Sequence, residues 1–334
     1  MAMKKLINNP DNIVQELLEG YALAYPQYIK LTEDRLVVRA KPKEEGKVGI
    51  VTLGGSGHEP ALSGWVGEGL LDISVPGEIF AAPGAPKCLK AIRMAEKGAG
   101  VLFVVLNHAG DMLTGNITMD LAEKEGLNVV KVVTQEDISN APRSDADNRR
   151  GLVGCLPVYK VAGAAAEEGK SLDEVREIAQ RMADNMATLA VALKPATHPA
   201  TGDPFFELPD DEMEVGIGQH GEAGTGRMKL KSADETAEIM LEALLKDLDV
   251  KSGEKLLVIL NGVGATTLME LFIVFRRVHQ LLEEKGIEVV GARLGELLTV
   301  QESAGFQMFI ARMDDELLRL WDAPCDSPYF SQSY

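Results

Sequence analysis

The segment Gly100-Val-Leu-Phe-Val-Val-Leu106 decides the fold class of this chain. It is apolar throughout, which is typical of a strand that is buried on both faces of a parallel sheet. Helical patterns flank it at residues 86–97 and 117–124, and further strands are predicted at 47–53 and 128–133. Strands that alternate with helices in this way predict a parallel sheet covered by helices on both faces.

The second half of the chain repeats the alternation of strands and helices. Residues 194–202, rich in proline and threonine, interrupt regular structure. We therefore predict two α/β domains, residues 1–190 and 191–334, each a β-sheet covered by helices. The other predicted elements are a strand at 71–75 that Pro76-Gly77 breaks, helices at 11–24, 152–168, 171–192, 233–248 and 267–285, and strands at 214–218, 255–260, 287–293 and 307–312.

The composition excludes several classes of protein. The chain has 334 residues and a net charge of −17, which disfavours nucleic acid and anionic membranes as partners. No stretch reaches the length of a membrane span, and the start Met1-Ala-Met-Lys-Lys5 leads into no apolar signal segment. The three cysteines form no CxxC pair and indicate reduced thiols. We expect a cytoplasmic location.

Two glycine-rich loops each hold one histidine. Gly216-Ile-Gly-Gln-His-Gly-Glu-Ala-Gly224 contains His220, Gly54-Gly-Ser-Gly-His-Glu-Pro60 contains His58, and each loop follows a strand-like run. Glycine lets the backbone approach a ligand closely, and a histidine held there can act as nucleophile, base or ligand. The alternative for His58 is a turn histidine that bonds the backbone. We favour function for both and predict one site assembled from the two loops.

Asp111 lies just beyond the strand 100–106, where parallel sheets bind ligands. It is either a residue of the site or the N-cap of the next helix, and the pattern leaves both open. The spacing Gly216-x-Gly218-x-x-Gly221 formally matches a dinucleotide fingerprint, but no helix pattern follows it, so we reject that site. A phosphate-binding loop and metal-ligand spacing are also missing. We expect no nucleotide cofactor and no metal on this chain.

A set of longer motifs resembles the dihydroxyacetone kinase family, and within it the ketose-binding K subunit. The resemblance extends from about Ile7 to Pro324, nearly the whole chain. The motifs that carry it are GGSGHEP, GLNVVKVVT, RRGLVG, KVAGAAAEEG, QHGEAG, ILNGVGATTLMELFIVFRRVHQLLEEKGI and LLRLWDAP.

The resemblance implies roles for the loop residues. His220 would form a covalent hemiaminal with the carbonyl of a small ketose such as dihydroxyacetone, and Asp111 would accept the proton of the hydroxyl group that is phosphorylated. His58 would hydrogen-bond the ketose and assist adduct formation, while Gly55, Ser56 and Gly57 would cradle it. It also implies a homodimer that works with a separate L-type subunit, on which Mg-ATP or ADP is expected.

The chain departs from the family pattern around the ligand loops. Leu106 stands where members carry a substrate-contacting lysine, and His108 where they carry a tyrosine; both positions are expected to line the substrate site. Leu62 replaces a histidine, and Ala223 replaces a proline after the HGE motif. These changes leave two substrates open, dihydroxyacetone and a related small ketose with four carbons.

Two functions remain open, a phosphotransferase subunit and a ketose-sensing coactivator. Sensing needs the adduct but no base, so the presence of Asp111 together with His58 and His220 favours the kinase. Because a nucleophilic imidazole must be neutral, we expect ketose binding to weaken below about pH 6.

Overall fold

The computed structural model describes residues 5–222, 224 and 226–333; the predicted departure at Ala223 lies outside them. The chain divides into two compact units. The first unit holds the described residues up to Thr134, Cys155–Ala183 and those from Arg319 onward; the second holds Gln135–Gly154 and Asp184–Leu318. Among the described residues, no helix combines the length and the apolar character needed to cross a membrane.

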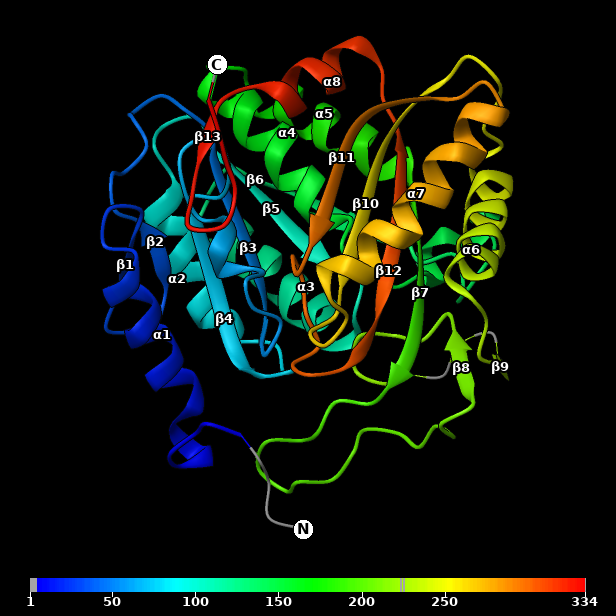
Figure 1. The fold of residues 1–334 in the computed structure, drawn as a ribbon. Coiled ribbons are helices and arrows are strands. Elements are labelled where there is room, and N and C mark those ends of the chain that lie inside the picture. The colour runs from blue at the N-terminus through cyan, green and yellow to red at the C-terminus, as the bar shows by residue number, and fades with distance from the viewer. Residues whose placement is uncertain (1–4, 223, 225, 334) are drawn as a thin grey trace. The chain divides into compact units, whose positions relative to one another are not determined.

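The first unit is built on a six-stranded sheet with the order β1-β2-β4-β3-β5-β6 (Figure 1). The strands from β4 to β6 run parallel, as predicted, whereas β1 and β2 add an antiparallel edge that the pattern did not predict. The elements are β1 (Ile29–Leu31), β2 (Val37–Arg39), β3 (Gly49–Ser56), β4 (Ile73–Ile79), β5 (Val101–Leu106), β6 (Val129–Thr134), α1 (Ile13–Ala24), α2 (Ala85–Ala95), α3 (Ala109–Lys124), α4 (Cys155–Glu167) and α5 (Leu172–Asp184).

Helices cover both faces of this sheet because alternate residues of its strands point to opposite sides. Val51 and Phe103 pack in a core cluster with Ile92 of α2. On the other face, the Thr52 hydroxyl donates to Val104 O over 2.9 Å and lies 2.8 Å from the Tyr159 hydroxyl of α4. An apolar β5 therefore signals burial between two helical layers.

Two predicted boundaries in this unit are wrong. The strand β4 continues through Pro76-Gly77 to Ile79: its pairing with β2 ends at Ser74, and beyond that point Pro76 pairs with Gly54 of β3. The helix predicted at 117–124 begins at Ala109. A Cβ at Gly115 would lie 3.2 Å from Val105, so glycine in this part of the helix allows close packing on β5.

The second unit is built on a sheet with the order β11-β10-β12-β7-β8-β9. Only β10 and β11 pair in parallel; the other pairs are antiparallel, in contrast to the mainly parallel sheet of the first unit. The elements are β7 (Met186–Lys194), β8 (Glu212–Val215), β9 (Gly226–Lys229), β10 (Lys255–Gly262), β11 (Glu288–Gly295), β12 (Ala304–Arg312), α6 (Ala233–Leu248) and α7 (Leu268–Glu284); α8 (Asp315–Asp322), β13 (Cys325–Asp326) and β14 (Ser331–Gln332) complete the chain.

The helices α6 and α7 cover one face of the second sheet. Leu244 and Leu271 pack there against Val258 and Met308 in one core cluster. Both helices start with a capping box, Ser232 with Glu235 and Thr267 with Glu270, which satisfies two otherwise unpaired backbone donors at each N-terminus. The start of α6 agrees with the helix predicted at 233–248.

The predicted helix 171–192 ends early. Its capping box is present, since Ser171 N donates to Glu174 and Glu174 N to the Ser171 hydroxyl, but residues 186–194 form β7 and pair with β12. Periodicity does not separate a fully buried strand from a buried helix. The chain consequently passes into the second unit at Asp184, before the predicted domain boundary at 190/191, and residues 135–154 also belong to that unit.

Glu136 of the second unit leads to a pH prediction. Its carboxyl group accepts from Leu152 N at 2.7 Å and Gly154 N at 2.8 Å, and burial raises its pKa to about 7 against the effect of these bonds. The folded state therefore holds this proton more tightly than the unfolded state, and stability falls as pH rises from about 4.5 through 7, by about 3 kcal/mol. Urea unfolding should show this loss in the wild type and a flatter profile in E136Q. Parallel profiles for the two proteins would contradict the assignment.

Candidate functional site

The first glycine loop begins where β3 ends. The Ser56 hydroxyl donates to Gly77 O over 2.9 Å, and Gly57 N donates to the Glu59 carboxylate at 3.1 Å. His58 is 6% exposed, and its ring lies 4.7 Å from the ring of Phe80, centroid to centroid. The His58 imidazole is thus held by packing on an aromatic ring.

Close packing requires glycine in this loop. A Cβ at Gly55 would lie 2.7 Å from Ala81 N, and Gly57 has φ +99° with the Phe80 ring 2.8 Å from the place of a Cβ. Each residue therefore lets the backbone pass under the segment that carries Phe80. The role of Gly55, Ser56 and Gly57 as a cradle for the ketose stays a prediction.

Replacing Gly57 with alanine should both destabilise the first unit and displace His58. The positive φ costs about 1 kcal/mol, and the collision with Phe80 should add about 1–3 kcal/mol. Gly46→Ala is the matched control, since Gly46 has φ +81° with nothing within 4 Å of a Cβ. Urea unfolding measures both variants. An equal loss in the two would show that backbone strain alone, and not the contact with Phe80, is responsible.

Asp111 lies in the first turn of α3, after β5. Leu106 is the last residue of β5 and is 4% exposed, His108 is the N-cap residue of α3, and Asp111 is 8% exposed. The N-cap alternative for Asp111 is therefore wrong. Because β3 and β5 are neighbouring parallel strands, His58 and Asp111 both follow strand ends at one edge of the first sheet, as the pattern predicted.

Residues 80–83 contact both loops of this edge. Gly55 packs against Phe80 and Ala81. A Cβ at Gly110 would lie 3.4 Å from the Cβ of Ala82, and the Thr114 hydroxyl of α3 donates to Pro83 O over 3.0 Å. The segment therefore fixes the start of α3 relative to the glycine loop within the first unit.

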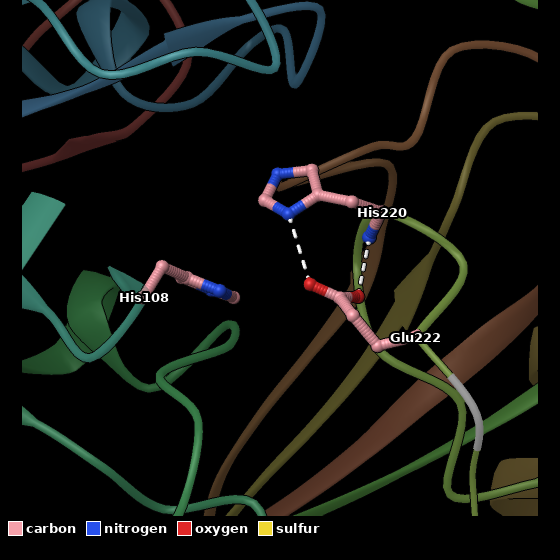
Figure 2. A group of neighbouring side chains, drawn as sticks. All are labelled: His108, His220 and Glu222. Carbon is pink, nitrogen blue, oxygen red and sulfur yellow. Dashed lines mark hydrogen bonds and ion pairs between the residues drawn. The ribbon is translucent and has the colours of Figure 1, made fainter. Parts of the chain in front are cut away.

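His220 belongs to the second unit, in the loop that follows β8. Its Nδ1 lies 3.2 Å from Glu222 Oε1, and its backbone N–H donates to Glu222 Oε2 over 2.9 Å (Figure 2); His108, also labelled there, belongs to the first unit. Burial alone would raise the pKa of Glu222, but the hydrogen bonds and electrostatic attraction of His220 outweigh it and hold that pKa well below its usual range. In the neutral tautomer of His220 that carries its proton on Nδ1, an ionised Glu222 would accept Nδ1–H and the lone pair would lie on Nε2.

A buried arginine, Arg150, is hydrogen-bonded to the backbone of this loop. Arg150 donates to Gly216 O over 2.7 Å and, through Nε, to Asp137 over 2.8 Å. A Cβ at Gly218 would collide with both the Glu222 carboxylate and the Arg150 guanidinium. Glycine at position 218 is thus required by the packing of these two charged groups against the loop.

The comparison with known proteins decides the family. The sequence model of the Dak1 domain matches residues 19–329. The chain belongs to the Dak1 family. The resemblance that its motifs carry is thereby confirmed over nearly the whole length.

Relatives of this Dak1 family member include both kinases and a coactivator. It is 38% identical to the dihydroxyacetone-binding subunit DhaK of a PTS-dependent dihydroxyacetone kinase of Listeria innocua, over 94% of this chain and 95% of that subunit. It is 39% identical to an L-erythrulose kinase of Pectobacterium atrosepticum, over 98% of this chain but 56% of that longer protein. The solved structure of the dihydroxyacetone kinase operon co-activator DhaQ matches with a TM-score of 0.90 and 32% identity, over 96% of this chain and 98% of that one.

Sequence reasoning missed two supporting residues of this Dak1 chain. Glu222 was visible inside the motif His-Gly-Glu, two residues from His220, but its role depends on the loop geometry that returns its carboxylate to the imidazole. Arg150 lies 66 positions before Gly216, whose carbonyl accepts its hydrogen bond, and only the motif Arg-Arg-Gly-Leu-Val-Gly marked it.

Proposed function

We propose that this chain is the ketose-binding subunit of a dihydroxyacetone-type kinase. It holds a small ketose as a hemiaminal on His220 and presents a hydroxyl group for phosphorylation by a separate L-type subunit. The two units are its two α/β domains, and the chain works as a homodimer. The observation that carries the proposal is the pair His220–Glu222, which prepares an imidazole as a nucleophile in a loop of a Dak1 family chain.

The pair determines how the adduct forms. With Nδ1–H directed at the ionised Glu222, Nε2 adds to the carbonyl carbon of the ketose and the π electrons of the C=O bond move to oxygen. That oxygen takes up a proton, for which His58 is the proposed donor, and Nδ1–H gives its proton toward Glu222. The product is a neutral hemiaminal. A polyol such as glycerol has no carbonyl group and is rejected.

Asp111 is the proposed base of the transfer step. The terminal hydroxyl of the bound ketose attacks the phosphoryl group in line, and the Asp111 carboxylate accepts its proton. The adduct contributes by fixing the hydroxyl in one orientation, which removes much of the entropic cost of the reaction.

The phosphoryl group comes from the partner. Mg-ATP or ADP is expected on the L-type subunit, and this chain supplies no nucleotide loop of its own. The substrate is dihydroxyacetone or a four-carbon ketose of the erythrulose type. The apolar Leu106, in place of a cation, and His108 are the residues that we expect to set this preference.

A ketose-sensing coactivator is the second candidate. It is favoured by the close structural match to the co-activator DhaQ. A coactivator would need the adduct on His220 but no base at Asp111, so the two functions differ in whether turnover accompanies binding.

A reconstituted phosphorylation assay tests the proposal. The chain is mixed with an L-type subunit and Mg-ATP, or with a phosphorylated phosphotransferase carrier, and is offered dihydroxyacetone, glyceraldehyde or erythrulose. Turnover with one of them, absent for glycerol, supports the kinase and identifies its substrate. Ketose binding without turnover beside a subunit that is active with another Dak1 chain would establish the coactivator instead.

A further inference from the structure

A cavity of about 240 Å³ lies in the first unit, away from the ligand loops. It is bounded by β2, by the start of β4 at Ile73 and by the end of α2 at Ala95. The glycine loop and α3 follow the opposite, carboxyl ends of the parallel strands. The cavity therefore belongs to a different edge of the sheet from the proposed ketose-binding residues of this unit.

Arg39 lines this cavity, and two of its guanidinium nitrogens donate no hydrogen bond to the described residues. The side chain is 6% exposed, and its hydrogen bonds to Asp72 (2.9 Å) and Glu167 (2.7 Å) both come from NH1. Within the part of the chain that the structure describes, Nε and NH2 make no such bond. These atoms form the fork that binds a carboxylate or phosphate in a bidentate manner.

Charged groups in ion pairs surround the Arg39 guanidinium. Lys43, with a side chain 2% exposed, donates to Val48 O at 2.9 Å and lies 2.8 Å from Asp72, so the one carboxylate in the cavity wall is already neutralised from two sides. Lys97 lies at the rim, where its ammonium group is 3.6 Å from the Glu45 carboxylate. Arg39 itself pairs with both Asp72 and Glu167, so an anion would be attracted by the unused donors of the Arg39 guanidinium and not by an excess of positive charge.

The remaining walls are apolar. Val38, Ile73 and Ala95 line the cavity, and Met94, 39% exposed, closes its outer side. The volume is below the range of about 300–1,000 Å³ that holds drug-sized ligands. The shape and chemistry fit a small molecule with an anionic head and a short apolar body.

We propose that this cavity binds a small amphipathic anion, whose phosphate or carboxylate group pairs with Arg39 and whose apolar part contacts Ile73 and Met94. The site is separate from the proposed ketose site. No residue of the proposed kinase mechanism takes part in it.

Calorimetric titration with four probes tests the site: butyl phosphate, butyrate, inorganic phosphate and butanol. We expect one butyl phosphate or butyrate per chain to bind with a Kd in the range of about 0.1–10 mM, inorganic phosphate to bind more weakly, and butanol not to bind. The relative affinities of butyl phosphate and butyrate identify the preferred head group. The same titration of H220A should be unchanged, which separates this site from the ketose site.

Three variants locate the binding. Lys97→Ala should weaken it about three- to tenfold by removing the rim cation, and Met94→Trp should weaken it at least about tenfold by filling the cavity from its exposed side. Lys90→Ala is the matched control on α2, since Lys90 pairs with Asp34 and does not line the cavity. Far-ultraviolet circular dichroism checks that each variant folds. Absence of saturable binding by both organic anions, or equal losses in K90A and K97A, would overturn the proposal.

Discussion

Replacing His220 with alanine should abolish ketose binding and turnover together. The hemiaminal bond cannot form without the imidazole, and a small ketose offers too few other contacts to be held. We expect kcat/KM to fall by at least about 10³-fold. His220 is 27% exposed at its side chain and belongs to a loop, so the fold should survive, and circular dichroism together with urea unfolding checks this. Mass spectrometry of the wild type with dihydroxyacetone should show the mass of an adduct that H220A lacks.

Two substitutions of Glu222 test whether its charge, and not only its size, supports adduct formation on His220. Glu222→Gln keeps the size of the side chain but removes the negative charge opposite Nδ1–H, and it should lower kcat/KM about tenfold. Glu222→Ala should lower it further, because nothing then orients the ring. If H220A still binds ketose with the affinity of the wild type, the covalent mechanism is wrong, whatever the result for Glu222.

Local chemistry made some elements predictable. The start of α6 follows from Ser232 and Glu235, whose reciprocal bonds are complete within one turn. The strand β5 was likewise predictable from its own sequence, because all of its residues are apolar. β7 was mistaken for helix because the residues that distinguish the two lie far away: Leu189 pairs with Met308 of β12, and no local pattern contains that pairing.

The sequence motifs were enough to select candidate residues for the site. The two glycine-framed histidines and the aspartate after β5 stand out in the sequence, because glycine and strand ends are local signals. The bond between Glu222 and Nδ1 of His220 and the support by Arg150 depend on the three-dimensional course of the loop. Sequence reasoning therefore found the proposed reacting groups and missed those that orient them.

Replacing Asp111 with asparagine should separate binding from catalysis. Asparagine has nearly the same shape and suits the first turn of α3, so the helix and the ketose adduct should persist. The amide cannot accept the proton of the attacking hydroxyl, and we expect kcat to fall about 10²–10⁴-fold while adduct formation, followed by mass spectrometry, stays unchanged. Asp120→Asn is the matched control, because it removes the same charge from an exposed position of the same helix.

The pair of variants distinguishes the two candidate functions. In a kinase subunit, D111N binds ketose without turning it over, whereas D120N keeps both properties. In a coactivator, the wild type itself shows no turnover, and D111N leaves ketose binding and every downstream response unchanged. If D111N lost the adduct as well, Asp111 would hold the substrate instead of acting as the base, because a group needed only for proton transfer does not contribute to the ground-state complex.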